Sequence, residues 1–459
     1  MFLEALWSFI DSFIHQSFFS TTAIMKKYIV LTCASIAIIG LVFLGASHAQ
    51  ELSPSQSTPK GVPSNRADML KALDRLKYRE ARLPLPPANE DSNLPVSNSS
   101  ASTSIQSGGR TSMGVVNNGR MRNLYLPPEL QIRGGRYPAV SDQGLPYDFS
   151  TELFWIVSRV NNCHYCLGHQ EHKLKSVGVT EPTLLALDSD WSAFPEKQRA
   201  AFAFTRQLTL APHTITDRDI DALRVHFSEE QILDMAFTVG RYNATNRWTD
   251  SLGIPQEEQR EFVSTLDPQV ASTPSQVAPV GFPKREKFDD YTDWLAEFER
   301  QSTRQPRLSM ASFEPHDGIF AHEQLLSEIP AAGPAFVEQL HQARIVGQIP
   351  VGLRDQIAYV AAREDQAWYM QNVSRTRLLA EGLSDHEIFQ LTAGSSSSGA
   401  QSVALQFVKK LTTHPQSMTD QDIQNLSHFY SSEQIAEIVY HTGLAATLNR
   451  VTEVVCLGW

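Results

Sequence analysis

The sequence predicts an all-α protein built from two related helical bundles in tandem. From about residue 121 onward, apolar residues recur at spacings of three and four, without the alternating β-branched runs that indicate strands. In addition, a block of residues beginning near position 204 returns about two hundred residues later in the same order. The first pattern indicates helices, and the second indicates an internal duplication.

Composition narrows the classes of partner. The 459 residues, 42% of them hydrophobic, supply enough apolar material for two or three domains with cores of their own. The formal net charge of -11, with no stripe rich in Lys and Arg, argues against nucleic acid or an anionic membrane surface as the main partner. We therefore expect small molecules or other proteins as partners.

Residues 1–49 have the pattern of a signal peptide. Met25, Lys26 and Lys27 form a basic start, residues 28–45 are almost continuously apolar, and residues 47–49 are suited to cleavage before Gln50. Met25 is the expected true start. An uncleaved anchor helix is the alternative, because the apolar stretch approaches the ~20 residues that span a bilayer. Both interpretations place the rest of the chain outside the cytoplasm, in the periplasm or the extracellular space.

Residues 50–115 are predicted to contain one short helix followed by a linker. The helix covers residues 64–80, where Met69, Leu70, Leu73 and Leu76 form a stripe, and it ends before the prolines at 84, 86 and 87. Residues 89–109 are rich in Ser and Asn and poor in apolar residues. This composition is typical of a disordered linker.

The repeat divides the remaining chain. Residues 204–209, 216–220 and 228–232 return as 407–412, 419–423 and 431–435, and the pair at 246–247 returns at 449–450. The repeated blocks include four predicted N-caps: Thr216, Thr419, Ser228 and Ser431. We predict one bundle over 116–265, a linker over 266–315 that is rich in Pro, Ser, Thr and Val at its start, and a second bundle over 316–459.

The cysteines indicate redox chemistry. Cys33 belongs to the signal segment and Cys456 stands alone, whereas Cys163 and Cys166 are separated by two residues. One such pair in a long exported chain is not a disulfide-stapled scaffold. The capping residues at 161 and 162 predict that Cys163 occupies the first turn of a helix, where the helix dipole favours the thiolate. A disulfide can span three residues of a helix, so the pair could cycle between dithiol and disulfide.

Catalysis by a dithiol also requires a base and a proton donor. Glu152 lies on the preceding predicted helix and could remove a proton through a water or a histidine. His169 and Gln170 follow Cys166 by three and four residues, and therefore share its helical face. The candidate site residues are Cys166, Cys163, Glu152 and His169.

In residues 152–178, Glu152 is followed eleven positions later by Cys163, and two residues separate Cys163 from Cys166. Tyr165 precedes the second cysteine, and a histidine and Gly178 follow it. This pattern resembles the alkylhydroperoxidase D / carboxymuconolactone decarboxylase family. Residues 242–253 are similar to the last core helix of that family. The resemblance covers about residues 121–255 directly, and 320–459 only through the repeat. The family's histidine stands four residues after the second cysteine, where this chain has Gln170, so we expect His169 to replace it.

The resemblance implies an all-α fold that forms homo-oligomers, and an antioxidant activity of the peroxiredoxin type. In that activity Cys166 attacks a small hydroperoxide, Cys163 resolves the product, and a dithiol reductant that the sequence does not identify restores the pair. No cofactor or metal is implied. Ala367, Met370 and Gln356 stand where the first bundle has Cys163, Cys166 and Glu152, so the second bundle is predicted to be inactive and to pack as half of an internal pseudo-dimer.

The sequence allows other interpretations of the cysteine pair. The two thiols could be buried and inert, or could form a static disulfide in an exported binding module. A decarboxylase-like lyase is a second enzymatic interpretation, although the family's decarboxylases do not depend on such a pair. A zinc site from Cys163, Cys166, His169 and His172 is disfavoured, because four ligands within ten helical residues cannot readily surround one ion. Covalent haem is excluded because Leu167 follows Cys166.

Overall fold

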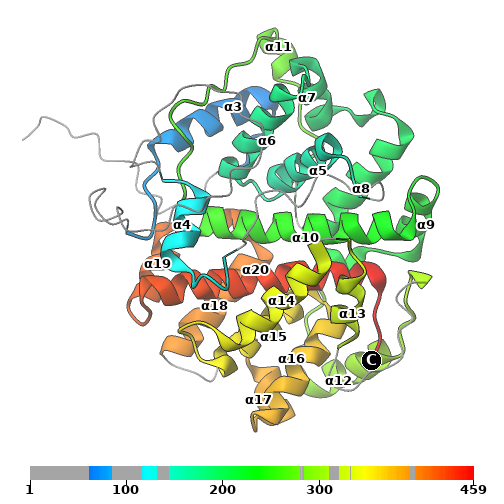
Figure 1. Ribbon diagram of the computed structural model, residues 1–459, viewed down its shortest axis with the longest axis vertical. Helices are drawn as coiled ribbons and strands as arrows, with labels where there is room; N and C mark the ends of the chain where they lie inside the picture. Colours follow the sequence, from blue (N-terminus) through cyan, green and yellow to red (C-terminus); the bar gives the residue numbers. More distant parts are fainter. Residues whose placement is uncertain are drawn as a thin grey trace, which may run out of the picture. The chain divides into compact units, whose positions relative to one another are not determined.

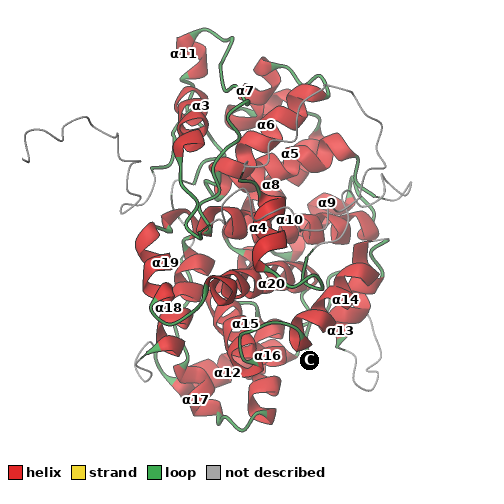
Figure 2. Cartoon of the chain, turned by 60° about the vertical axis from the view of Figure 1, so that its left-hand side comes forward, coloured by secondary structure: helices red, strands yellow, loops and turns green. Residues whose placement is uncertain are grey.

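The computed structural model describes residues 61–84, 116–131, 144–279, 281, 284–309, 320–330, 332–392 and 399–459, all within the compact unit Ser55–Trp459. Every regular element in these ranges is a helix (Figures 1 and 2), so the all-α prediction is confirmed. None of the described helices combines the length and apolar character needed to cross a bilayer. The predicted signal segment 1–49 and the low-complexity segment 89–109 lie outside the described residues.

We call residues 61–279 the first half and 284–459 the second half. The helices of the first half are α3 (Arg66–Arg75), α4 (Asn118–Tyr125), α5 (Tyr147–Val160), α6 (His164–Ser176), α7 (Glu181–Ser189), α8 (Glu196–Leu210), α9 (Asp217–Arg224), α10 (Glu229–Ser251) and α11 (Pro268–Ala271). Those of the second half are α12 (Tyr291–Ser302), α13 (Ala321–Ser327), α14 (Ala332–Ile345), α15 (Val351–Asp365), α16 (Trp368–Ala380), α17 (Asp385–Gln390), α18 (Ala400–Thr413), α19 (Asp420–Ser427) and α20 (Ser432–Val455). Short 3-10 turns follow α3, α7, α8 and α18.

The predicted N-caps are confirmed at all four positions. Thr216 and Thr419 begin α9 and α19, and Ser228 and Ser431 begin the long helices α10 and α20. Each forms a capping box, in which its side chain accepts from the third helical residue and that residue's side chain accepts from the cap's backbone amide. The starts of these helices are therefore determined locally by sequence.

Helices α10 and α20 pack against each other along the middle of the molecule, where Figure 1 draws them in green and red. Glycines permit the close approach. A Cβ at Gly240 would lie 3.0 Å from the carbonyl oxygen of Thr447, and one at Gly443 would lie 3.3 Å from Cβ of Ala244. The two contacts are reciprocal, so the same part of each helix meets the other.

Two buried arginines link the halves. Arg247 on α10 donates from Nη2 to the carbonyl oxygen of Thr412 at 3.0 Å, and Arg450 on α20 donates from Nη2 to that of Thr209 at 2.9 Å. Each guanidinium therefore satisfies a carbonyl near the end of a helix in the other half. The pair at 246–247 and its repeat at 449–450 thus have a structural function.

Helix α3 packs on α6 rather than standing apart from the first bundle. Buried Arg66 donates from Nη1 and Nη2 to both carboxylate oxygens of Glu171, at 2.9 and 2.8 Å, and from Nε to Glu181 at 2.8 Å. In the second half, α12 contacts α16 through the aromatic residues Trp294 and Phe298. In each half, a helix that precedes the bundle in sequence packs against it: α3 against α6, and α12 against α16.

Candidate active site

The turn between α5 and α6 positions the two cysteines. The amide of Cys163 donates to the carbonyl oxygen of Ser158 at 2.9 Å and that of Asn162 donates to Arg159 at 3.2 Å, which is the Schellman pattern. Asn162 adopts the left-handed conformation this pattern requires, with φ of 52°. Cys163 is consequently the N-cap of α6, which corrects the predicted first-turn position by one residue, because Asn161 and Asn162 end α5 instead of capping α6. Cys166 lies in the first turn.

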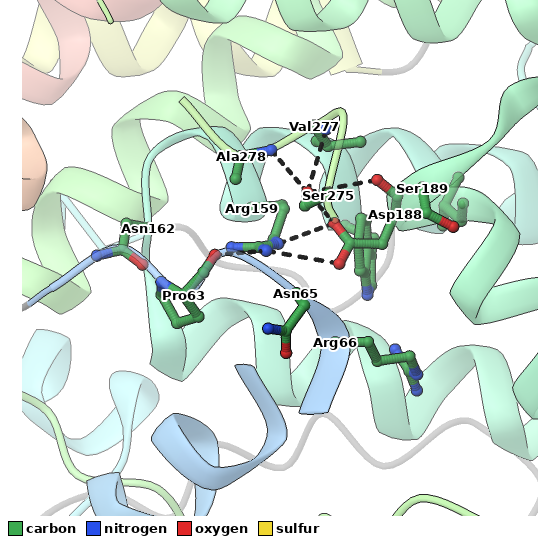
Figure 3. A network of polar contacts seen from close by, with 12 residues as sticks. Pro63, Asn65, Arg66, Arg159, Asn162, Asp188, Ser189, Ser275, Val277 and Ala278 are labelled. Carbon is green, nitrogen blue, oxygen red and sulfur yellow. Dashed lines mark hydrogen bonds and ion pairs between the residues drawn. The ribbon is translucent and has the colours of Figure 1, made fainter. Parts of the chain in front are cut away.

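A polar network fixes this turn from the side of the N-terminal segment (Figure 3). Arg159, near the end of α5, bonds Asp188 from Nε at 3.0 Å and donates from Nη2 to the carbonyl oxygen of Pro63 at 2.8 Å. Ser275 from the segment after α10 donates to Asp188 as well. Asn162 donates from Nδ2 to the carbonyl oxygen of Gly61 at 3.2 Å. The segment before α3 therefore holds Arg159 and Asn162 directly, and the segment after α10 reaches Arg159 through Asp188.

Both sulfurs contact one hydroxyl. Oγ1 of Thr249 on α10 lies 3.2 Å from Sγ of Cys163 and 3.1 Å from Sγ of Cys166. Both cysteines are thiols and are buried. The Thr249 hydroxyl also donates to the carbonyl oxygen of Thr245 at 3.0 Å, so in this arrangement its lone pairs face the two S–H groups. The geometry is that of a reduced dithiol whose sulfurs are neighbours.

Buried amides of α10 hold the end of α5 beside the thiols. Asn161 donates from Nδ2 to Oδ1 of Asn243 and of Asn246, at 3.0 Å each. Burial raises the pKa of Cys166 well above its ordinary value, and the neighbouring Cys163 raises it further. Hydrogen bonds from Thr249 and Asn246 act in the opposite direction. In this closed arrangement Cys166 is therefore held in its thiol form.

Two arginines contribute positive charge to the site. The guanidinium of Arg79, which follows α3, interacts with Cys163 and forms a salt bridge of 3.2 Å with Asp250. Arg122 on α4 interacts with Cys166 and lies 4.7 Å from the ring centre of Trp248. Burial lowers the pKa of Arg122 to about 10, which still leaves it charged at neutral pH. A thiolate at either sulfur would be stabilised by these charges.

Glu152 lies on α5 and is buried. Its Oε2 accepts a hydrogen bond of 2.8 Å from Nε2 of Gln198 on α8. Burial raises its pKa to about 7, against the opposing effect of Gln198. In the second half Gln401 donates to Gln356 at 2.6 Å at the corresponding positions, so this contact also occurs where the cysteines are replaced. A pKa near 7 is suited to proton transfer, and the partner of the carboxyl in this structure is Gln198.

His169 has its hydrogen-bond partners away from the sulfurs. Its Nδ1 donates to the carbonyl oxygen of Tyr165 at 2.9 Å, and its Nε2 lies 3.1 Å from Oε1 of Glu257. Burial raises the pKa of Glu257, but His169 and Arg260 outweigh burial and lower it to about 2. Both ring nitrogens of His169 therefore face hydrogen-bond acceptors. The structure thus brings Cys163 and Cys166 together, whereas Glu152 and His169 contact Gln198 and Glu257.

The other polar residues of the motif have local roles. Gln170 donates from Nε2 to the carbonyl oxygen of Cys166 at 3.2 Å, and Nε2 of His164 lies 2.9 Å from Oδ1 of Asn162. His172 is exposed, and burial together with Arg260 lowers its pKa. Within the described part of the chain, His, Cys, Asp and Glu side chains form no group of three that could hold a metal ion.

Access to the sulfurs is narrow. A cavity of about 40 Å³ lies between the halves and is lined by Arg122, Thr245 and Trp248 among others, but by neither cysteine. On α5, Phe154 packs against the cluster that contains the cysteines, and its ring stacks on Tyr242 with centroids 3.8 Å apart. A substrate therefore reaches Cys166 only after side chains move.

Sequence reasoning did not identify Thr249, Arg79 or Arg122. Each belongs to an element distant in sequence from the cysteines, and each contact depends on packing that periodicity does not reveal. The only local signal was the Thr at 249, inside the segment 242–253 that resembles the family's last helix. That resemblance indicated the helix but not the contact between Thr249 and the two sulfurs.

Comparisons with known proteins add little. A search against models of protein families found no match. Part of the chain is similar to the uncharacterized protein YdfG of Bacillus subtilis (strain 168), with 26% identity over 101 residues, which is 21% of this chain and 68% of that protein. That name states no activity. The family resemblance of residues 152–178 therefore stays a prediction.

Proposed function

We propose that the protein is a thiol-dependent peroxidase of the alkylhydroperoxidase D type that uses Cys163 and Cys166. The observation that carries the proposal is the contact of both sulfurs with Oγ1 of Thr249, at 3.2 and 3.1 Å, at the start of a helix. Such a pair can exchange between dithiol and disulfide with little backbone movement. The charges of Arg79 and Arg122 favour the thiolate that the reaction requires.

The reaction balances as follows. The thiolate of Cys166 attacks one oxygen of a small hydroperoxide, ROOH, so that an S–O bond forms, the O–O bond breaks, and the leaving alkoxide takes a proton as ROH. The thiolate of Cys163 then attacks the sulfur of the Cys166 sulfenic acid. The S–S bond forms and the hydroxyl leaves as water after taking a proton. An external dithiol returns two electrons and two protons and is itself oxidised to a disulfide.

Activation must overcome the burial of Cys166. Its raised pKa means that a base has to accept its proton during the attack. Glu152, with a pKa of about 7, is the proposed base, and it would reach the thiol after leaving Gln198 or through a water. His169 is proposed as the proton donor to the leaving oxygen, which requires its ring to turn from Glu257.

We also propose that the two halves are tandem copies of one ancestral bundle. Reciprocal contacts support this: Arg247 to Thr412 and Arg450 to Thr209 occupy corresponding positions in the repeat. The second copy would then act as the permanent partner of the first, with further association into a homo-oligomer. Export by the segment 1–49 and a reductant outside the cytoplasm complete the proposal.

The test is hydroperoxide consumption by the mature chain in the presence of dithiothreitol. We expect turnover by the wild type, loss of turnover in Cys166→Ser, and accumulation of a sulfenic acid in Cys163→Ser, detected with dimedone. Cys456→Ser is the matched control, because it removes a thiol outside the pair. Undiminished turnover in Cys166→Ser would refute the peroxidase proposal. A disulfide that resists all mild reductants would instead support a binding module.

A further inference from the structure

A second cavity lies in the half that lacks the cysteines. Its volume is about 70 Å³, and it is lined by residues of α13, α14, α15, α16 and α20. Met370, which stands at the position of Cys166, forms part of its wall. The dithiol proposal gives this cavity no role.

The cavity exists because two aromatic side chains are replaced by alanine. In the first half Phe154 on α5 stacks on Tyr242 on α10. The corresponding residues on α15 and α20 are Ala358 and Ala445, and both line the cavity. Space that the first half fills with two stacked rings is therefore open in the second half. Loss of the cysteines alone would not have produced it.

Residues that line the cavity carry buried polar atoms without a hydrogen-bond partner. These atoms are Oδ2 of Asp355 on α15, and Nε2 of His441 and Oδ1 of Asn449 on α20. His441 is 8% exposed and Asn449 is fully buried. Eight helical residues separate them, which corresponds to about 12 Å along the axis. A buried polar atom without a partner is costly, so a ligand with polar groups at two ends would relieve both.

Charged side chains line the cavity, and Arg354 acts on His441. Near His441, Arg354 donates to the carbonyl oxygens of Ala343, Arg344 and Ile349, and its charge acts on the imidazole. Burial together with that charge lowers the pKa of His441 to about 3, so the ring is neutral and can donate a hydrogen bond from Nε2. The lining includes three guanidiniums and two carboxylates, on Arg344, Arg354, Arg377, Glu323 and Asp355. These five side chains carry one net positive charge. Asp355 pairs with Arg344 and Arg377, and buried Glu437 on α20 also acts on Arg354.

The middle of the cavity is apolar. Ala358, Met370, Leu444, Ala445 and Leu448 form the wall between His441 and Asn449. A hydrocarbon chain of a few carbons would contact these side chains and displace water from them.

We propose that this cavity binds a short aliphatic carboxylate, with its charged head at His441 and its chain against Ala358 and Ala445. A hydroxyl on the far end of the chain donates to Oδ1 of Asn449, so a hydroxy acid binds more tightly than the plain acid. The second half is then a ligand-binding domain attached to a redox domain, and its ligand is unrelated to the peroxide.

The test measures binding of butyrate, 4-hydroxybutyrate, butyramide and butylamine to the full mature chain by isothermal titration calorimetry. We expect saturable binding of the two acids, several-fold tighter for 4-hydroxybutyrate, and at least tenfold weaker binding of the amide and the amine. Ala358→Leu should fill the cavity and abolish binding. His441→Leu should weaken the acids at least tenfold, whereas His428→Leu, at an exposed position, should change nothing.

Folding of each variant is checked independently by circular dichroism and by titration of the Cys163 and Cys166 thiols. Ala445→Leu provides a second cavity-filling variant if Ala358→Leu fails to fold. No saturable binding of either acid to the wild type overturns the proposal. Unchanged binding in both folded cavity-filling variants, or equal binding of acid and amine, overturns it as well.

Discussion

Replacing Thr249 by Val tests whether the shared hydroxyl tunes the dithiol. The substitution keeps the shape of the side chain and removes the oxygen that lies 3.2 and 3.1 Å from the two sulfurs. A hydrogen bond to a charged group contributes roughly 1.5–3 kcal/mol. We expect only part of this free energy at Thr249. Its hydroxyl has one hydrogen, which must leave the carbonyl oxygen of Thr245 before it can be donated to a thiolate. The net effect on thiolate formation is therefore about one pKa unit, or ~1.4 kcal/mol.

The assay is the rate of alkylation by iodoacetamide as a function of pH in the reduced protein. Because Thr249 lowers the pKa of Cys166, we expect Thr249→Val to move the profile to higher pH and to slow alkylation about tenfold on its acidic limb. Thr452→Val is the matched control, since its hydroxyl makes the corresponding bonds to Leu448 and Asn449 on α20 without a nearby thiol pair. A profile that stays in place, or moves equally in both variants, would refute this reasoning.

Three further predictions concern stability and access. The folded-state pKa of Glu152 is raised from 4.5 to about 7, so its carboxyl costs stability as the pH rises through that interval. Glu152→Gln should stabilise the protein by on the order of 1–3 kcal/mol at pH 8 and hardly at all at pH 4 in urea titrations, and equal effects at both pH values would contradict this. Phe154→Ala should open the stack with Tyr242 and accelerate alkylation of the thiols by a bulky maleimide several-fold, whereas an unchanged rate would place the entrance elsewhere. Arg247→Met leaves the carbonyl of Thr412 without its donor and should cost roughly 1.5–3 kcal/mol in urea titrations, and no loss would show that the bond is dispensable.

Local sequence determines much of the fold. Apolar spacing predicted helices, and the capping boxes at Thr216, Ser228, Thr419 and Ser431 were readable because each involves residues three positions apart. The predicted start of α6 differs from the structure by one residue, and the cause is also local. Asn162 can either cap a helix or adopt the left-handed conformation that ends one, and the structure uses the second option.

The candidate site was only partly readable, because most of its contacts join distant segments. The spacing of Cys163 and Cys166 is visible in one stretch of sequence, whereas Thr249 reaches them only once α10 packs against α6. The helical spacing that places His169 near Cys166 is real, but tertiary packing supplies Glu257 as a stronger partner for the ring. Periodicity predicts the helical face on which a side chain lies. It does not predict which residue from another helix or loop will form a hydrogen bond with that side chain.

The second half shows which features of the site are structural and which are chemical. Thr452 retains the hydroxyl and its bonds to the backbone of α20, so a Thr at this position belongs to the helical framework and by itself says nothing about catalysis. The same holds for the contact of Glu152 with Gln198, which Gln356 and Gln401 reproduce. What differs is the pair of thiols and the stack of Phe154 on Tyr242. Because the stack occurs in the half that has the dithiol, and alanines stand at the corresponding positions of the other half, we expect the stack to limit access to the dithiol. In an activity assay, faster access alone should raise the turnover of Phe154→Ala. Faster over-oxidation of Cys166 should instead make its activity decline during turnover.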